Sequence, residues 1–190
     1  MAKVLLDLSM SLDGFVAGPN VSVESPMGDG GERLHDWLFE STPNEVDARV
    51  AKEMHSATGA VVLGRRTFDV GVNVWQDTPY PVPCFVLTHK PLEQRVEKSG
   101  TFDFVTDVDD ACRLATAAAG DRHVRLMGAE LSQLFLRAGL VDEIRIQLVP
   151  VLMGGGRRLF EDLGPERIEL ERADVVESPH VTHLRFRVMK

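Results

Sequence analysis

Two segments of this chain pass from a short apolar run through a glycine directly into a helical pattern. Residues 60–63 are Ala-Val-Val-Leu and end at Gly64, and residues 123–127 end at Gly128. A short apolar run bounded by turn signals predicts a buried strand, and each of these two strands precedes a helix. Strands that alternate with helices predict a largely parallel sheet, because parallel neighbours need a crossover connection. We therefore expect an α/β fold.

Apolar patterns elsewhere in the chain continue this alternation of strands and helices. The last apolar runs follow one another without a helix between them, which predicts strands that join the sheet antiparallel to their neighbours. A strand is expected at each of residues 3–10, 60–63, 82–88, 102–106, 123–127, 141–149, 168–176 and 180–188. Helices are expected at residues 32–39, at 45–56, from 107 or 109 to 119, and at 128–137. A helical turn is expected at 158–160, and long loops at 11–31 and 71–81. The second helix is expected to begin at an Asn44 cap.

Two late strands alternate in polarity, which places neighbouring side chains on opposite faces of the sheet. In residues 141–149, Arg145 and Gln147 alternate with aliphatic side chains. In the last strand, the side chains expected to face outward are His183, Arg185 and Arg187, and those expected to face inward are Leu184, Phe186 and Val188.

The chain has 190 residues, 44% of them hydrophobic, and a formal net charge of −8. This composition suits one globular domain over residues 1–190. The acidic balance argues against a nucleic-acid or membrane surface, and no apolar stretch approaches the ~20 residues of a membrane span. Asp7 comes too early for a signal peptide, so we expect a cytoplasmic protein in which Cys84 and Cys112 stay reduced.

Gly64 is followed by two guanidinium groups and a hydroxyl, on Arg65, Arg66 and Thr67. We expect Gly64 to permit a tight turn that a residue with a Cβ would resist. Arginine presents a planar fork of donors that suits phosphate, and free N–H groups at a helix start also attract anions. This strand end is therefore a candidate phosphate-binding corner and indicates a phosphorylated cofactor.

Three further segments are candidates to meet the same ligand. After Gly128, the first N–H groups of the next helix point beyond the strand end, where they can bind an anion. The alternative is a glycine that is needed only for the turn between strand and helix. Thr88, His89 and Lys90 add a hydroxyl and two side chains that can carry a positive charge at another strand end, with a solvated turn as the alternative. Residues 13–18 place an apolar patch between two glycines, which is typical of a closing lid.

The histidines have no metal-ligand spacing, and no serine or cysteine motif supports a nucleophile. We therefore expect no metal site. The chemistry that remains is carried by a bound cofactor, which the protein holds and orients.

Several motifs occur together in an order that one family shares. Over residues 4–188 the chain resembles the dihydrofolate reductase-like superfamily, and within it the reductase domain of riboflavin biosynthesis (RibD C-terminal type). The resemblance implies a three-layer α/β/α fold around a mixed, mostly parallel sheet, with NADPH as hydride donor. The motifs are Ser11-Leu12-Asp13-Gly14, Leu63-Gly64-Arg65-Arg66-Thr67-Phe68, Gly128-Ala129-Glu130-Leu131, Gly139-Leu140-Val141-Asp142-Glu143 and Pro150-Val151-Leu152-Met153-Gly154-Gly155-Gly156.

The resemblance also implies which residues contact the cofactor. The Gly64 corner and the Thr88 strand end would hold the 2′-phosphate and pyrophosphate. The Gly128 turn would lie against the pyrophosphate and nicotinamide, and the first loop would close over the nicotinamide. The implied cofactor-binding residues are Asp13, Gly14, Val16, Ala17, Gly18, Gly64, Arg65, Arg66, Thr67, Thr88, His89, Met127, Gly128, Ala129, Glu130 and Leu131.

The chain departs from the family pattern where substrate would bind. Dihydrofolate reductases carry a carboxylate three residues before a helix tryptophan, and that position before Trp37 is Leu34. Asp36 is the candidate catalytic acid, and a solvated helix residue is the alternative. The riboflavin enzymes carry a substrate-binding glutamate two residues before the turn glycine, where this chain has Leu126. Candidates for the apolar wall of the substrate site, or else core residues, are Phe15, Trp37 and Trp75.

We therefore expect an NADPH-dependent reductase that transfers hydride to a small pterin- or pyrimidine-like heterocycle. The alternatives are a non-catalytic dimeric protein that binds a nucleotide or heterocycle, and a reductase that uses a flavin-type cofactor. Because relatives of the riboflavin branch are commonly dimers, a homodimer is expected. Residues 141–149 and the strands after Ile168 are the candidates for a sheet extension between subunits. No nucleic-acid or membrane partner is expected.

Overall fold

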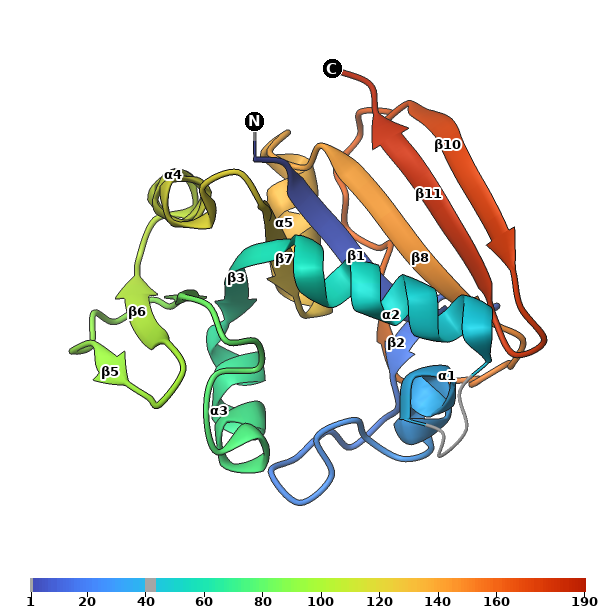
Figure 1. Ribbon diagram of the computed structural model, residues 1–190, viewed down its shortest axis with the longest axis horizontal. Helices are drawn as coiled ribbons and strands as arrows, with labels where there is room; N and C mark the ends of the chain where they lie inside the picture. Colours follow the sequence, from blue (N-terminus) through green and yellow to red (C-terminus); the bar gives the residue numbers. More distant parts are fainter. Residues whose placement is uncertain (1, 40–43) are drawn as a thin grey trace.

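The computed structural model describes residues 2–39 and 44–190, and one large mixed sheet dominates it (Figure 1). Its central strands run parallel, and the strands at both ends of the sheet are antiparallel to their neighbours. The mostly parallel α/β sheet is therefore confirmed. In spatial order the strands are β10 (Leu170–Glu177), β11 (Thr182–Val188), β8 (Glu143–Val149), β1 (Val4–Ser11), β7 (His123–Met127), β3 (Thr58–Gly64), β4 (Cys84–Leu87), β6 (Thr101–Val105) and β5 (Arg95–Val96).

Helices cover both faces of this sheet, which gives the three layers that were expected. One face packs against α4 (Val108–Ala119) and α5 (Ala129–Arg137). The other face is covered by α2 (Glu45–Ala57) and α3 (Arg65–Trp75), and α2 lies in front of the sheet in Figure 1. None of these helices, within the described ranges, is long and apolar enough to cross a membrane.

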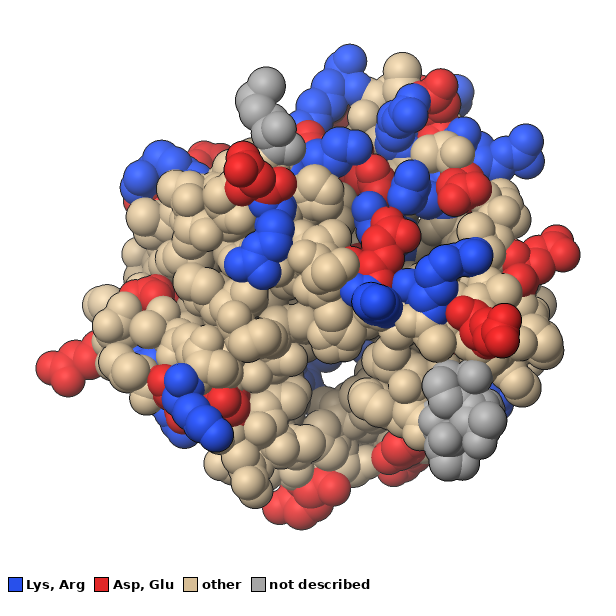
Figure 2. Space-filling view, in the orientation of Figure 1, with Lys and Arg blue, Asp and Glu red and all other residues tan. Residues whose placement is uncertain are grey.

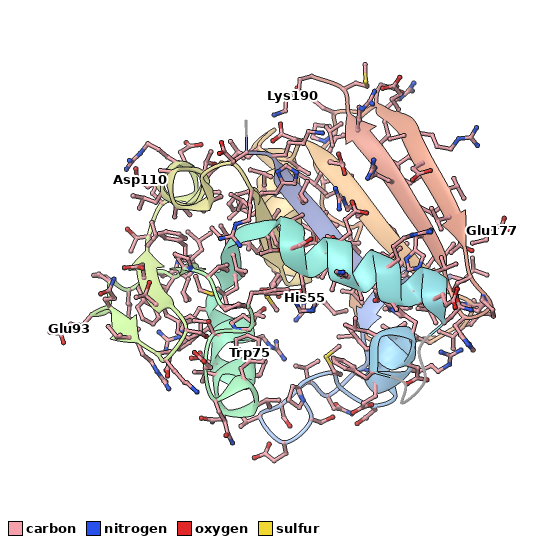
Figure 3. The ribbon with its side chains drawn as sticks, viewed as in Figure 1. His55, Trp75, Glu93, Asp110, Glu177 and Lys190 are labelled. Atoms are coloured by element: carbon pink, nitrogen blue, oxygen red, sulfur yellow. The ribbon has the colours of Figure 1, made fainter. Side chains whose placement is uncertain are left out.

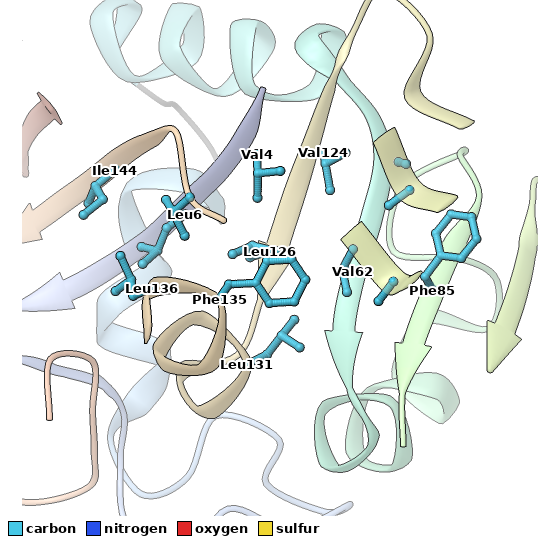
Figure 4. Close-up of a cluster of buried hydrophobic side chains, with 14 of the residues drawn as sticks. Val4, Leu6, Val62, Phe85, Val124, Leu126, Leu131, Phe135, Leu136 and Ile144 are labelled. Atoms are coloured by element: carbon cyan, nitrogen blue, oxygen red, sulfur yellow. The ribbon is translucent and has the colours of Figure 1, made fainter. Parts of the chain in front are cut away.

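Alternation along the strands divides the core into two apolar layers. Val62 and Leu126 point toward α5, where Phe135 is fully buried (Figure 4). Their neighbour Leu63 points to the opposite face, where it belongs to a cluster with Phe68 of α3. Burying one such side chain contributes about 1.5–3 kcal/mol, so the two layers fix the central strands and hold their carboxyl ends in place.

Three expected elements were wrong in part. Part of the first long loop forms β2 (Phe15–Ala17), which pairs with β9 (Arg157–Arg158) where a helical turn was expected. The second expected loop begins as the last turns of α3, because the Trp75 ring packs over Gly71. A Cβ on Gly71 would lie 2.3 Å from Trp75 Cζ2. A short 3₁₀ helix, η1 (Gly31–His35), leads into α1 (Asp36–Phe39) as expected for residues 32–39.

The polar side chains of the late strands do not all face solvent, contrary to the sequence pattern. Gln147 and His183 are buried, because α2 covers the face on which they lie. His183 Nε2 is 2.8 Å from Asp47 Oδ1 of α2, so the residue expected to face outward is part of the interior.

The expected sheet extension through residues 141–149 is also wrong. Both edges of β8 are occupied, one by β1 and the other by β11. The open edges of the sheet belong to β10 and β5. A homodimer stays a prediction, and β10 is the strand after Ile168 that leaves an edge free for it.

Candidate functional site

A cavity of about 1210 Å³ lies at the carboxyl ends of the parallel strands. The space-filling view shows an opening near the middle of the molecule, between α3 and the segment that precedes α1 (Figure 2). Because parallel strands end at one edge of the sheet, the turns after β3, β4 and β7 all reach this cavity. The structure therefore brings together the three corners that the sequence placed at separate strand ends.

Most of the predicted cofactor-binding residues line this cavity. The first corner contributes the start of α3, the second the end of β4, and the third the start of α5. Residues from β2 close the cavity on the side of the first loop. The predicted residues found in the lining are Val16, Ala17, Gly18, Gly64, Arg65, Arg66, Thr67, Thr88, His89, Met127, Gly128, Ala129, Glu130 and Leu131.

The helices α3 and α5 both start at the cavity with no side-chain cap. Their N-cap residues are Gly64 and Gly128, neither of which provides a side-chain hydrogen bond. The starts of α2 and α4, in contrast, are capped by the expected Asn44 and by Asp107. Because the first N–H groups of a helix lack intrahelical partners, the uncapped starts of α3 and α5 offer donors and a positive dipole end to an anion.

Of these two turn residues, only Gly128 requires glycine. It adopts a φ of 101°, and a Cβ on it would lie 2.5 Å from Thr67 Oγ1. This close approach joins the β3–α3 corner to the β7–α5 corner. Gly64 instead has φ −75° and ψ 156°, an extended conformation open to any residue, so the expected tight glycine turn is wrong there.

Cationic side chains gather at these corners although the whole chain is acidic. Arg65 Nε donates to Asp69 Oδ1 at 2.8 Å, and Arg66 Nη2 donates to the Val21 carbonyl at 3.4 Å. Lys90 follows Thr88 and His89 at the end of β4 and also lines the cavity. Exposed cations beside open N–H groups favour a phosphate at this end.

The first loop is fastened to the glycine-rich segment after β8 and does not form a free lid. The Asp13 carboxylate accepts hydrogen bonds from Met153 N at 3.0 Å and Gly154 N at 2.7 Å. With the Ser11 hydroxyl, these donors hold the pKa of Asp13 at about 2. The carbonyl of Gly14 accepts from Leu159 N at 3.0 Å. Asp13 and Gly14 are thus outside the cavity lining and position Val16 to Gly18 within it.

The four predicted catalytic and substrate-wall residues do not line the cavity. Asp36 is half-exposed and pairs with Arg33 at 3.4 Å. Phe15 is buried beneath the Arg158 guanidinium, whose carbon is 4.5 Å from the ring centroid. Trp37 is a core residue of the cluster that it forms with Leu34, Val149 and Val181. Trp75, at the end of α3 (Figure 3), packs against the cluster of that helix.

Two residues that sequence reasoning missed, Ser9 and His35, line the cavity at the end of β1 and in η1. Leu34 and Trp37 are three residues apart, which places them on one face of a helix, and both are buried. His35 directly follows Leu34 in the chain, so this spacing places it at the border of the apolar face. No comparable signal marks Ser9, because a serine inside an apolar strand is common. Among the described residues, no group of three or more His, Cys, Asp or Glu is arranged to hold a metal.

These features define an α/β protein with an anion-attracting cavity at the carboxyl edge of a mostly parallel sheet. The sequence model of the RibD C-terminal domain matches residues 2–184, and the chain belongs to that family. The uncharacterized protein YyaP of Bacillus subtilis (strain 168) is 26% identical over 179 residues, which cover 89% of this chain and 85% of that protein.

Solved structures agree with this family and fold. A candidate riboflavin biosynthesis protein from Shewanella sp. PV-4 superposes with a TM-score of 0.73 at 25% identity, covering 99% of each chain. A diaminohydroxyphosphoribosylaminopyrimidine deaminase/5-amino-6-(5-phosphoribosylamino)uracil reductase from Thermotoga maritima has a TM-score of 0.63 at 13% identity. That alignment covers 99% of this chain and 57% of the Thermotoga chain.

Proposed function

We propose that this protein is an NADPH-dependent oxidoreductase that transfers hydride to a small pterin- or pyrimidine-like heterocycle. The observation that carries the proposal is the meeting of two uncapped helix starts, those of α3 and α5, at one cavity with cationic side chains. A dinucleotide with a pyrophosphate and a further phosphate matches this set of donors. The Thermotoga protein, which is named in part as a 5-amino-6-(5-phosphoribosylamino)uracil reductase, has the same fold.

Each part of the cavity has a role in this proposal. NADPH, when bound, supplies the hydride from its nicotinamide ring. The first N–H groups of α3 and α5 donate to phosphate oxygens, and Arg65 and Arg66 neutralise the 2′-phosphate charge. Val16 to Gly18, held by the β2–β9 pairing, cover the nicotinamide and exclude water from it. The protein thus binds and orients the reactants.

Titration of the protein with NADPH and NADH tests the cofactor assignment. We expect micromolar binding of NADPH and at least ~tenfold weaker binding of NADH, a difference of ~1.4 kcal/mol that one charge-assisted contact supplies. Arg66→Ala should reduce this preference for NADPH. Arg113→Ala is the matched control, because Arg113 is exposed on α4 and pairs only locally with Asp110 at 2.8 Å. Equal affinity for both nucleotides in the parent protein would contradict the assignment.

A second candidate is a protein that binds the same ligands without turnover. The carboxylates in the lining, Asp107 and Glu130, belong to the corners of α4 and α5, whereas Asp36 lies outside the cavity. A site without a carboxylate beside the substrate favours binding over proton delivery. Tight heterocycle binding with no oxidation of NADPH would select this second candidate.

A further inference from the structure

The cavity has a second polar region, apart from the corners that carry the cations. It is formed by Ser9 at the end of β1 and His35 in η1. The surrounding lining includes the apolar side chains of Leu8, Val16 and Met27. Polar groups set among apolar ones fix the orientation of a small ligand, because a hydrogen bond is stronger where water is excluded.

The Ser9 hydroxyl is held in place by the indole of Trp37. Trp37 Nε1 donates to Ser9 Oγ at 2.9 Å, and both side chains are buried. The indole is itself fixed by an edge contact with the His183 ring, at 5.2 Å between centroids. Because this bond uses Ser9 Oγ as an acceptor, the hydroxyl hydrogen remains to be donated to a ligand.

His35 contributes an imidazole to the same lining from η1, which packs against β1. Its Nδ1 is buried, and the ring stacks on Phe39 with 6.3 Å between centroids. Burial lowers the pKa of His35, although the Gly31 carbonyl and the carboxylates of Asp36 and Glu32 act in the opposite direction. The ring is therefore neutral at pH 7 and carries one N–H and one lone pair.

We propose that Ser9 and His35 form a subsite that binds the uncharged lactam edge of a heterocycle, with Trp37 as the positioning residue for the Ser9 hydroxyl. A lactam edge places a carbonyl acceptor next to an N–H donor, and pterins and uracils both carry one. Ser9 donates to the carbonyl oxygen, and the neutral imidazole accepts from the N–H. This inference rests on the proposed function and identifies where its second ligand binds.

Two variants remove these contacts while keeping the packing. His35→Phe retains a ring that can stack on Phe39. The double variant Ser9→Ala/Trp37→Phe removes both partners of the buried hydrogen bond, which avoids leaving the indole N–H unsatisfied. Trp37→Phe alone keeps the Ser9 hydroxyl but removes the indole N–H that orients it. This variant therefore distinguishes the positioning role of Trp37 from the direct contact that Ser9 makes. His89→Phe is the comparison at another part of the lining, after the end of β4 and next to Lys90.

Calorimetry with pterin, uracil and NADPH as separate probes gives the test. We expect pterin or uracil to bind the parent protein, and to bind His35→Phe and the double variant about three- to tenfold more weakly, as for one lost hydrogen bond. Trp37→Phe should also weaken heterocycle binding. NADPH affinity should stay within about twofold in all three and fall only in His89→Phe. In imidazole NMR spectra, the heterocycle should shift the His35 signals and leave those of His89 in place.

The proposal is overturned if neither heterocycle binds the parent protein, or if the parent and His35→Phe bind it equally. Trp37→Phe with a lower melting temperature but parental heterocycle affinity would reduce Trp37 to a structural role and remove it from the proposal. Failure of NADPH to bind would reject the proposed function. The heterocycle measurements would still decide the Ser9–His35 subsite.

Discussion

Gly64 and Gly128 occupy the same place before their helices, but their backbone conformations differ. Gly128 combines a φ of 101° with the close approach of Thr67 Oγ1, whereas a Cβ on Gly64 would meet its nearest atom at 4.0 Å. Gly128→Ala should therefore destabilise the protein by about 1–3 kcal/mol through backbone strain. Gly64→Ala is the matched control and should change the free energy of unfolding by less than about 1 kcal/mol.

Urea unfolding of the two variants measures this difference directly. A parental midpoint for Gly128→Ala would mean that the β7–α5 turn adapts to a side chain. In that case the contact between Thr67 and Gly128 would not hold the two corners together.

At the scale of elements, the Asp13 carboxylate connects the β1–β2 turn to the segment before β9. Its pKa of about 2 lies below the model-compound value of 3.8, so the folded state favours the ionised form. This stabilisation is present above pH 3.8 and is lost as the pH falls toward 2. Asp13→Asn should therefore lower the melting temperature at pH 7, and its difference from the parent should shrink near pH 2.

Melting curves between pH 7 and pH 2 check this prediction. Asp36→Asn is a suitable control, because its carboxylate pairs with the nearby Arg33 and does not fasten the first loop. A stability difference for Asp13→Asn that stays constant with pH would show that the Asp13 charge does not fasten the loop.

At the scale of the whole molecule, a charged layer lies between the sheet and α2. Arg125 Nη2 of β7 donates to Asp7 Oδ2 of β1 at 2.6 Å, and both side chains are at most 6% exposed. Gln147 of β8 donates to the other oxygen of Asp7 at 2.9 Å. The buried Asp7–Arg125 pair, with Gln147, therefore ties three neighbouring strands together under the helix. On the surface, lysines, arginines and carboxylates gather over β8, β11 and β10 (Figure 2).

Removing one partner of this pair leaves a buried charge without compensation. Asp7→Ala should lower the free energy of unfolding by about 3–5 kcal/mol, and Asp7→Leu/Arg125→Met by considerably less. Denaturant unfolding of both variants measures the difference. Equal losses in the single and double variants would mean that packing, and not the unpaired charge, sets the cost.

The element order could be predicted from the sequence because strands and helices are determined by local periodicity and by capping residues. The apolar runs before Gly64 and Gly128 and the Asn44 cap were identified in this way. Most of the cofactor-binding residues that the family motifs implied lie in the cavity lining. The pairing of β2 with β9 was missed, because strands this short have little local signal and depend on a partner far along the chain.

The sequence by itself determined the α/β class, the family and the three corners that line the cavity, since each depends on residues adjacent in the chain. Only the tertiary structure decided which side chains face the cavity. It placed Trp37 in the core and His35 in the lining, although both belong to one short helical segment. It also buried Gln147 and His183, because α2 covers the face that polar alternation had assigned to solvent. The physical reason is that burial depends on what packs against a face, and the partner comes from a distant part of the chain.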